Sequence, residues 1–247
     1  MLSDRELERY KRQLMLCGFT KEHQDSLKSS TAVIAGIGGL GGAAAVYLAV
    51  AGIGRLVLVH YGNLTESNMN RQILMKNANI GLPRVDQAKD TINTINSYVE
   101  VITLNQRIES SSISNILEGA NIALSARPNF YERRILNAAC IQNKIPMIEA
   151  AMNGMEGYMF NVINEQTPCL ECVFPEDDPN WKELGFPVLG AVSGMLGCLM
   201  SIEAVKILTG FANPLIGKMF LFNTIDLEFK KVKIYKDENC RVCSQRQ

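Results

Sequence analysis

Short apolar runs alternate with longer stretches of helical pattern along the first part of the chain. The runs at residues 31–35 and 56–59 frame an alanine-rich helical stretch, and the same alternation continues downstream. Strands that alternate with helices form a mainly parallel sheet with helices on both faces. The pattern predicts further strands at residues 99–104, 122–124 and 146–151, and further helices at residues 84–97, 111–117 and 129–143.

The pattern changes after Gly154. A long apolar helix is predicted over residues 191–208, with Gly210 as its stop. Around it, residues 158–163, 218–221 and 226–232 are typical of antiparallel strands. We therefore predict one α/β domain over residues 1–247, with N-terminal helices at 1–30, a parallel half at 31–151, an antiparallel half at 152–247 and one continuous mixed sheet.

The N-terminal segment predicts one amphipathic helix over residues 2–16. Ser3 and Glu6 have the spacing of a capping box, in which each side chain binds a backbone N–H of the other. Residues 1–13 are highly charged, which is unlike a secretory signal. The uncharged stretch 186–202 is short for a bilayer and is interrupted by Pro187, so we interpret it as a buried helix. We expect a cytoplasmic protein without a membrane contact.

The composition excludes few functions. Formal net charge is zero, with 47% apolar and 20% charged residues, so bulk electrostatics gives no case for a nucleic-acid partner. Seven cysteines without a secretory signal indicate a reducing compartment, and hence thiols or a metal site rather than disulfides.

A glycine-rich turn, GIGGLG at residues 36–41, follows the first apolar run and opens the alanine-rich helix. Glycines let the backbone approach a phosphate, and the helix start offers free N–H groups and a positive dipole end. A dinucleotide site needs an acidic residue at the end of the second strand, but His60 stands there, so we disfavour an oxidoreductase. The polar loop 67–72 contains Arg71, which suits a triphosphate.

Two C-x-x-C pairs are formed by Cys169 with Cys172 and by Cys240 with Cys243. Two such pairs can present four thiolates to one tetrahedral zinc ion. A redox pair is the weaker interpretation, since neither pair opens a helix of a thioredoxin-like unit. All four positions of the zinc would be filled by protein, so we predict a structural zinc site.

These motifs resemble the ThiF/MoeB/HesA family, which is related to the adenylation domains of ubiquitin-activating enzymes. The matching pieces occur in the order of the family over nearly the whole chain. They are RYKRQ at 9–13, GIGGLG at 36–41, SNMNRQ at 67–72, GLPR at 81–84, and the cysteine pairs. The resemblance implies a Rossmann-like nucleotide-binding fold that carries a Cys₄ zinc knuckle.

The resemblance also implies ATP binding and adenylation of a carboxylate, commonly the C-terminal glycine of a ubiquitin-like sulfur carrier. It implies catalytic roles for Arg71, Asn68 and Arg12, with Arg12 reaching the site of a partner subunit in a homodimer. The residues that it places at the nucleotide are Gly36, Gly38, Gly39, Gly41, His60, Ser67, Asn68, Arg71, Arg84, Arg127 and Asn129.

The chain departs from the family pattern at three positions of the nucleotide site. His60 replaces an aspartate that holds the ATP ribose, although a surface histidine is an equally good interpretation of it. Arg84 replaces a lysine, which changes the geometry of the charge. Pro128 replaces the aspartate that organises magnesium, and proline has no carboxylate to hold a metal ion. Arg127 beside it is a candidate for binding phosphate or a substrate carboxylate.

The loop 174–188 holds no cysteine nucleophile, so an acyl adenylate would pass its acyl group to an external thiol or amine, for example on a separate acceptor protein. The carboxylate can be a carrier-protein tail or a small molecule in cofactor biosynthesis, such as guanylylpyridinol. The alternative is a non-catalytic relative that keeps the fold and the zinc and acts as a binding or scaffold subunit.

Overall fold

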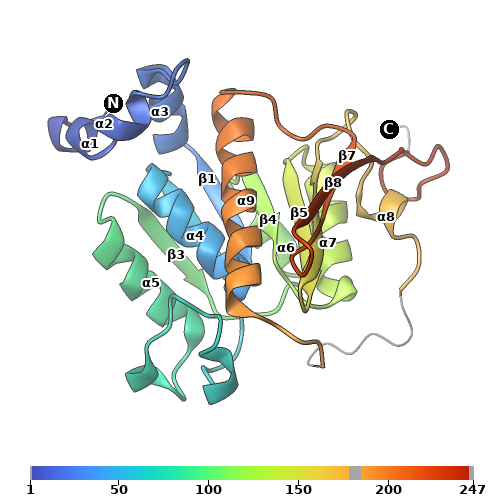
Figure 1. Ribbon diagram of the computed structural model, residues 1–247, viewed down its shortest axis with the longest axis horizontal. Helices are drawn as coiled ribbons and strands as arrows, with labels where there is room; N and C mark the ends of the chain where they lie inside the picture. Colours follow the sequence, from blue (N-terminus) through green and yellow to red (C-terminus); the bar gives the residue numbers. More distant parts are fainter. Residues whose placement is uncertain (1, 178–184, 245–247) are drawn as a thin grey trace.

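The computed structural model describes residues 2–177 and 185–244 (Figure 1). Its centre is an eight-stranded sheet with the order β3-β2-β1-β4-β5-β6-β7-β8. The five strands from β3 to β5 are parallel, and β6, β7 and β8 continue the sheet in antiparallel pairing. The predicted continuous mixed sheet is therefore confirmed. The strands are β1 (Thr31–Ala35), β2 (Arg55–Val59), β3 (Glu100–Leu104), β4 (Ile122–Ser125), β5 (Met147–Asn153), β6 (Glu156–Val162), β7 (Lys218–Asn223) and β8 (Glu228–Lys233).

Helices cover both faces of this sheet and enclose two apolar cores. Alternate residues of β1 face opposite ways, so that Ile34 lies in one core and Val33 in the other. The first core lies under α4, α5 and α9, and the second lies under α6, α7 and α8. The helices are α1 (Asp4–Arg9), α2 (Lys11–Leu14), α3 (Lys21–Lys28), α4 (Gly39–Ala51), α5 (Arg84–Ile95), α6 (Ile113–Ile116), α7 (Phe130–Gln142), α8 (Leu170–Val173) and α9 (Gly190–Thr209), with 3₁₀ turns η1 (Glu66–Asn68) and η2 (Asn77–Asn79).

The N-terminal segment is not one continuous helix as predicted, because it breaks at Tyr10 between α1 and α2. The Tyr10 ring is buried against Gly52 at the end of α4, and its hydroxyl accepts a hydrogen bond from Asn96 Nδ2 (2.9 Å). This tertiary contact outweighs the local helical pattern. The predicted capping box between Ser3 and Glu6 is present.

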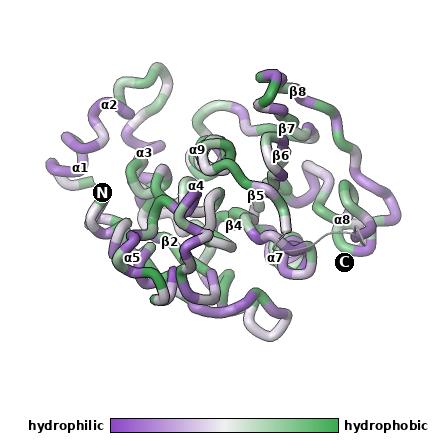
Figure 2. Tube along the Cα trace, turned by 60° about the horizontal axis from the view of Figure 1, so that its bottom comes forward, coloured by the Kyte–Doolittle hydropathy of each residue, from purple (hydrophilic) through white to green (hydrophobic). Residues whose placement is uncertain are grey.

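The helix α9 is a core helix in this structure. It is long and apolar enough to cross a membrane by length and composition alone. It lies beside α4 as a largely hydrophobic segment, as Figure 2 shows. Gly197 makes this packing possible, because a Cβ there would lie 2.3 Å from the Leu40 carbonyl oxygen. The side chains of Leu196 and Met200 are fully buried in the first core.

The glycine turn joins β1 to α4 through very close backbone contacts. Gly36 has a φ of +102°, which favours glycine, and a Cβ there would lie 2.5 Å from the Ala126 carbonyl oxygen. A Cβ on Gly41 would lie 1.8 Å from the Gly36 carbonyl oxygen. The turn therefore brings α4 down onto the end of β1 and sets the loop after β4 directly beside it.

We expect Gly41→Ala to lower the free energy of unfolding by roughly 2–3 kcal/mol, because the added methyl group must displace backbone. Gly194→Ala in α9 is the matched control, since a Cβ there meets no heavy atom within 4 Å. The control is expected to be neutral or to stabilise the helix by up to ~1 kcal/mol. Urea denaturation of both variants checks this, and equal stability of the two would contradict the close approach.

Candidate functional site

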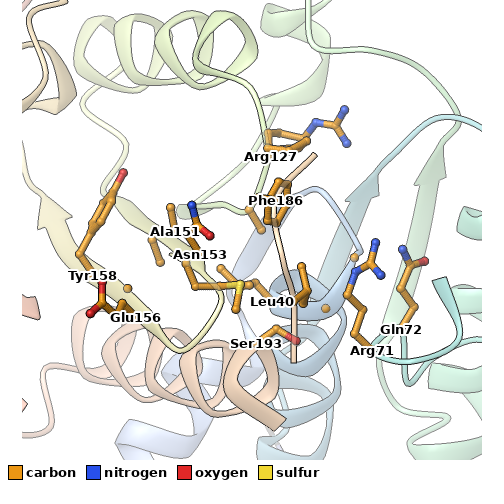
Figure 3. Close-up of a pocket in the computed structure, with 18 of the residues that line it drawn as sticks. Leu40, Arg71, Gln72, Arg127, Ala151, Asn153, Glu156, Tyr158, Phe186 and Ser193 are labelled. Carbon is orange, nitrogen blue, oxygen red and sulfur yellow. The ribbon is translucent and has the colours of Figure 1, made fainter. Parts of the chain in front are cut away.

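A cavity of about 1220 Å³ opens at the carboxyl ends of the parallel strands. This edge of an open α/β sheet is where ligands bind. One end of the cavity is formed by the glycine turn, the end of β2 and the loop 63–72. The other end is formed by β5, β6, β7 and β8. Figure 3 shows the two ends, with Arg71 and Gln72 together at one and Tyr158 and Glu156 together at the other.

The structure brings most of the sequence-predicted nucleotide residues to one end of this cavity. Gly36 and Gly41 shape the turn without lining the cavity, Asn129 lies outside the lining, and Arg12 lies on α2. The predicted residues that line the cavity are Gly38, Gly39, His60, Ser67, Asn68, Arg71, Arg84 and Arg127.

The loop 63–72 presents Arg71 from a short turn held by internal hydrogen bonds. Asn68 is buried, and its Oδ1 accepts from the Thr65 amide (3.0 Å). Arg71 Nη1 donates to the Ser67 carbonyl (2.8 Å) and to Asn70 Oδ1 (2.7 Å). Arg71 is therefore held in place by neutral oxygens, and no acidic side chain in the described part of the chain pairs with its charge.

His60 is buried at the end of β2, so its interpretation as a surface histidine is wrong. Its Nδ1 accepts from the Ile37 amide (3.3 Å) and lies 3.0 Å from Arg127 Nη1. Since both neighbours are donors, the ring proton resides on Nε2. Burial, followed by the charges of Arg84 and Arg127, holds the pKa of His60 well below its usual value. The ring is therefore neutral, and its buried Nε2–H has no partner among the described residues.

The contacts of Arg127 and Asn129 belong to the start of α7. Arg127 Nε lies 2.6 Å from Glu132 Oε2, and both side chains are almost fully buried. The guanidinium also packs over the Tyr61 ring, 4.7 Å from its centroid. The Asn129 Oδ1 accepts from the Glu132 amide (2.8 Å) and caps the helix. Arg127 thus bridges Glu132 and His60 and positions the histidine.

Arg84 lies next to this group at the start of α5. It donates to the carbonyl oxygens of Tyr61 (2.6 Å) and Gly62 (3.2 Å). Burial, together with the nearby charge of Arg127, lowers the pKa of Arg84. The end of β2 is therefore a positively charged corner of the cavity.

The wall at the other end of the cavity contains a polar network that the sequence motifs did not indicate. Arg133 of α7 contacts Glu149 of β5 and the Tyr158 hydroxyl of β6, and its guanidinium lies 4.3 Å from the Phe130 ring centroid. Arg133 and Glu149 are buried, and the attraction between their charges raises the pKa of Arg133 despite burial. Three elements supply this network, so no local motif in the sequence marks it.

The four cysteines of the two C-x-x-C pairs meet between α8 and the C-terminal segment. Their sulfur atoms all lie within 4.8 Å of one another. The separations are 3.9 Å for Cys169–Cys172, 3.6 Å for Cys169–Cys240 and 3.4 Å for Cys172–Cys243. A tetrahedral zinc ion with Zn–S bonds of about 2.3 Å requires sulfurs roughly 3.8 Å apart, so the cluster fits zinc. Zinc here would tie the C-terminal segment to α8 at a distance from the cavity.

The sequence profile of the ThiF family matches residues 10–242. The chain belongs to the ThiF family. The resemblance indicated by the motifs is therefore confirmed. The relatives of this ThiF-family chain include HesA proteins and molybdopterin-synthase adenylyltransferases. It is 47% identical to the heterocyst protein HesA of Trichormus variabilis, over 98% of this chain and 90% of that one. It is 34% identical to the molybdopterin-synthase adenylyltransferase of Salmonella typhimurium, over 99% of each chain.

Solved structures share the fold. A structure of PaaA superposes with a TM-score of 0.83 at 26% identity, covering 96% of this chain and 76% of that one. The structure of E. coli MccB with ATP superposes with a TM-score of 0.84 at 21% identity, covering 95% and 74% of the two chains.

We expect Cys243→Ser to abolish binding of one zinc ion per chain, because the ion loses one of four thiolates. The Tm is expected to fall by on the order of 5–10 °C, which corresponds to roughly 2–3 kcal/mol. Elemental analysis and calorimetry measure the two effects. Cys17→Ser, at an exposed cysteine outside the cluster, is the control. Equal zinc content in the two variants would contradict the site.

The neutral His60 predicts a pH dependence of stability. In the unfolded chain this histidine takes up a proton near pH 6.5, whereas the folded protein resists it. The contribution of His60 to the free energy of unfolding is therefore fully present above about pH 6.5. It is lost as the pH falls toward the lower pKa of the folded state, by at most about 1.4 kcal/mol per pH unit. Denaturation between pH 7 and pH 5 should show this slope, and His60→Gln should reduce it. An unchanged slope in the variant would rule out the buried neutral ring.

Proposed function

We propose that this chain adenylates a carboxylate at the expense of ATP. The observation that carries the proposal is the position of Arg71 and Arg84 in one cavity with the glycine turn. The 34% identity to a molybdopterin-synthase adenylyltransferase over 99% of both chains supports it. The substrate carboxylate oxygen attacks the α-phosphorus, the bond from that phosphorus to the bridging oxygen breaks, and pyrophosphate leaves.

We call the end of the cavity formed by the glycine turn, the end of β2 and the loop 63–72 the nucleotide end. Each group at this end has a part in the reaction. The backbone at Gly38 and Gly39 lies against the phosphates at the start of α4, where the helix dipole favours negative charge. Arg71 stabilises the charge that develops on the leaving pyrophosphate, and stabilisation of this kind contributes most of the catalysis in phosphoryl-type transfers. Asn68 holds the loop that carries Arg71, and His60 lies where a ribose would lie.

The other end of the cavity takes the carboxylate substrate. Its lining includes Met152, Phe186, Val188 and Phe222, which suit an extended chain or a small organic acid. A sulfur-carrier tail and a small carboxylate of cofactor biosynthesis are both compatible with this lining. No cysteine lines the described part of the cavity, and residues 178–184 of the preceding loop lie outside the described residues. The acyl group therefore passes to an external thiol or amine.

Arg12 acts in a partner subunit under this proposal. It is exposed on α2, beside the C-terminal end of α4, where Gln13 Nε2 donates to the Ala51 carbonyl (3.1 Å). The glycine turn lies at the other end of α4, a helix of 13 residues and thus about 20 Å long. Arg12 cannot cover this distance within one chain. The exposed side chains of Met15 and Leu16 next to it fit a subunit interface.

A second candidate function is a non-catalytic binding subunit, and Pro128 favours it. Proline stands at the cavity where the family resemblance implies an aspartate. This function predicts that the purified chain forms no AMP or pyrophosphate with any carboxylate. Adenylate formation by the chain alone would exclude it.

We expect Arg71→Ala to reduce carboxylate-dependent pyrophosphate exchange by about 100-fold or more, because the leaving group loses its main counter-charge. Lys76→Ala is the matched control, since it removes an equal charge from an exposed residue outside the cavity lining. Exchange that is equally fast in both variants would remove Arg71 from the mechanism.

The homodimer predicts complementation between two inactive variants. Arg12→Ala keeps an intact cavity, and Arg71→Ala keeps an intact Arg12 to donate to its partner. Random pairing makes half of the dimers mixed, each with one complete site, so activity should return to about a quarter of the wild-type value. Co-expression with two affinity tags isolates the mixed dimers. Mixed dimers as inactive as the parents would show that the sites are not shared.

A further inference from the structure

We propose that the nucleotide end of the cavity binds the triphosphate as its metal-free anion, neutralised by arginine side chains rather than by a magnesium ion that the protein holds. This inference rests on the proposed function, because it concerns the same nucleotide. It concerns the charge state of the ligand and the side chains that meet it, and it holds for binding whether or not adenylation follows.

Among the residues that the structure describes, carboxylates are missing where a magnesium ion would need them. Magnesium in nucleotide sites is held by one or two carboxylates as well as by the phosphates. Among the described residues that line the cavity, the carboxylates are Glu156 and Glu228, on β6 and β8. Figure 3 shows Glu156 at the opposite end from Arg71. Pro128, in the loop after β4, offers no ligand atom from its side chain. These residues do not fit a protein-held magnesium ion.

Glu132, an acidic side chain behind this end of the cavity, is already paired with neighbouring side chains. Its carboxylate pairs with Arg127 and also accepts from Asn129 Nδ2 (3.2 Å). It is 2% exposed and does not line the cavity. A metal ion could reach Glu132 only by displacing a buried guanidinium, which would leave that charge unpaired and is strongly unfavourable.

Two of the arginines at this end, Arg71 and Arg84, lack acidic partners within the described chain. Arg71 donates to the Ser67 carbonyl and to the Asn70 amide oxygen, and Arg84 donates to two backbone carbonyls. Carbonyl oxygens orient a guanidinium without cancelling its charge. Guanidinium groups match phosphate oxygens in pairs of parallel hydrogen bonds. The two arginines are therefore pre-positioned for an anion, and they would repel a cation.

The hydrogen bonding of His60 is an independent observation in favour of an anionic ligand at this end. Its Nδ1 is occupied by two donors, and its buried Nε2–H faces no acceptor in the described structure. A buried donor without an acceptor is unfavourable, so a ligand oxygen at this position would be stabilising. A ribose hydroxyl or a phosphate oxygen meets that need, whereas a cation does not. The aspartate that the family resemblance implies at this position would accept hydrogen bonds, whereas His60 offers a donor.

The test is calorimetric titration of the full, zinc-loaded chain with the non-hydrolysable α,β-methylene analogue of ATP. One titration uses excess EDTA and the other uses excess magnesium chloride. We expect the Kd in EDTA to be lower than, or within about threefold of, the Kd in magnesium. A Kd in EDTA that is higher by more than this overturns the inference. Absence of binding in both conditions overturns it together with the proposed function.

Two substitutions at one position sharpen the test. Pro128→Asp restores a carboxylate and is expected to make binding in EDTA about tenfold weaker than binding in magnesium. Pro128→Ala removes the ring without adding a carboxylate and should keep the ratio of the unmodified chain. Equal ratios in the two variants would overturn the inference. Tight binding of the analogue in EDTA, together with no AMP formed when ATP and a carboxylate are supplied instead, would support the inference and would count against adenylation alone.

Discussion

The close backbone approach at the glycine turn is the constraint on which the rest of the structure depends. Gly41 packs onto the Gly36 carbonyl, and Gly36 packs onto the Ala126 carbonyl, with no room for a side chain at either glycine. These contacts fix the start of α4 against β1 and bring the loop after β4 alongside. Arg127 follows directly in that loop and reaches His60 at the end of β2. The geometry of the cavity is thus set by atoms of the main chain.

Charge divides the cavity into two parts with different roles. Arg71 and Arg84 face one end and have no acidic partner among the described residues, and the neutral His60 adds a donor. At the other end, Arg133 is balanced by Glu149 within a wall that also contains Tyr158 and Phe130. The first part suits a polyanion, and the lining of the second combines apolar side chains with charged ones. Under the proposed function, the nucleotide occupies the first part and the carboxylate the second, with the reacting atoms between them.

Features that depend on near neighbours in the sequence were predictable. The apolar runs marked the strands, the glycine spacing marked the turn, and the change after Gly154 marked the switch to antiparallel pairing at β6. The two C-x-x-C pairs marked a metal cluster although 71 residues separate Cys169 from Cys240. In each case a local pattern favours one physical explanation over its alternatives, so no knowledge of tertiary contacts was necessary.

Features that depend on distant partners were not predictable. The break at Tyr10 is imposed by Gly52 and Asn96, and the burial of His60 is completed by Arg127, 67 residues away. The network of Arg133, Glu149 and Tyr158 joins one helix to two strands. The sequence shows which residues are polar or charged at these sites. It does not show which of them contact one another, because those contacts form only when the sheet assembles.

The most direct measurement is a crystal structure of the chain with a bound non-hydrolysable ATP analogue. We expect the phosphates against Gly38 and Gly39, within hydrogen-bond distance of Arg71 and Arg84, and a ligand oxygen on His60 Nε2. A nucleotide bound outside this cavity, or one held through a magnesium ion coordinated by a protein carboxylate, would contradict the assignment of the cavity and of its charge.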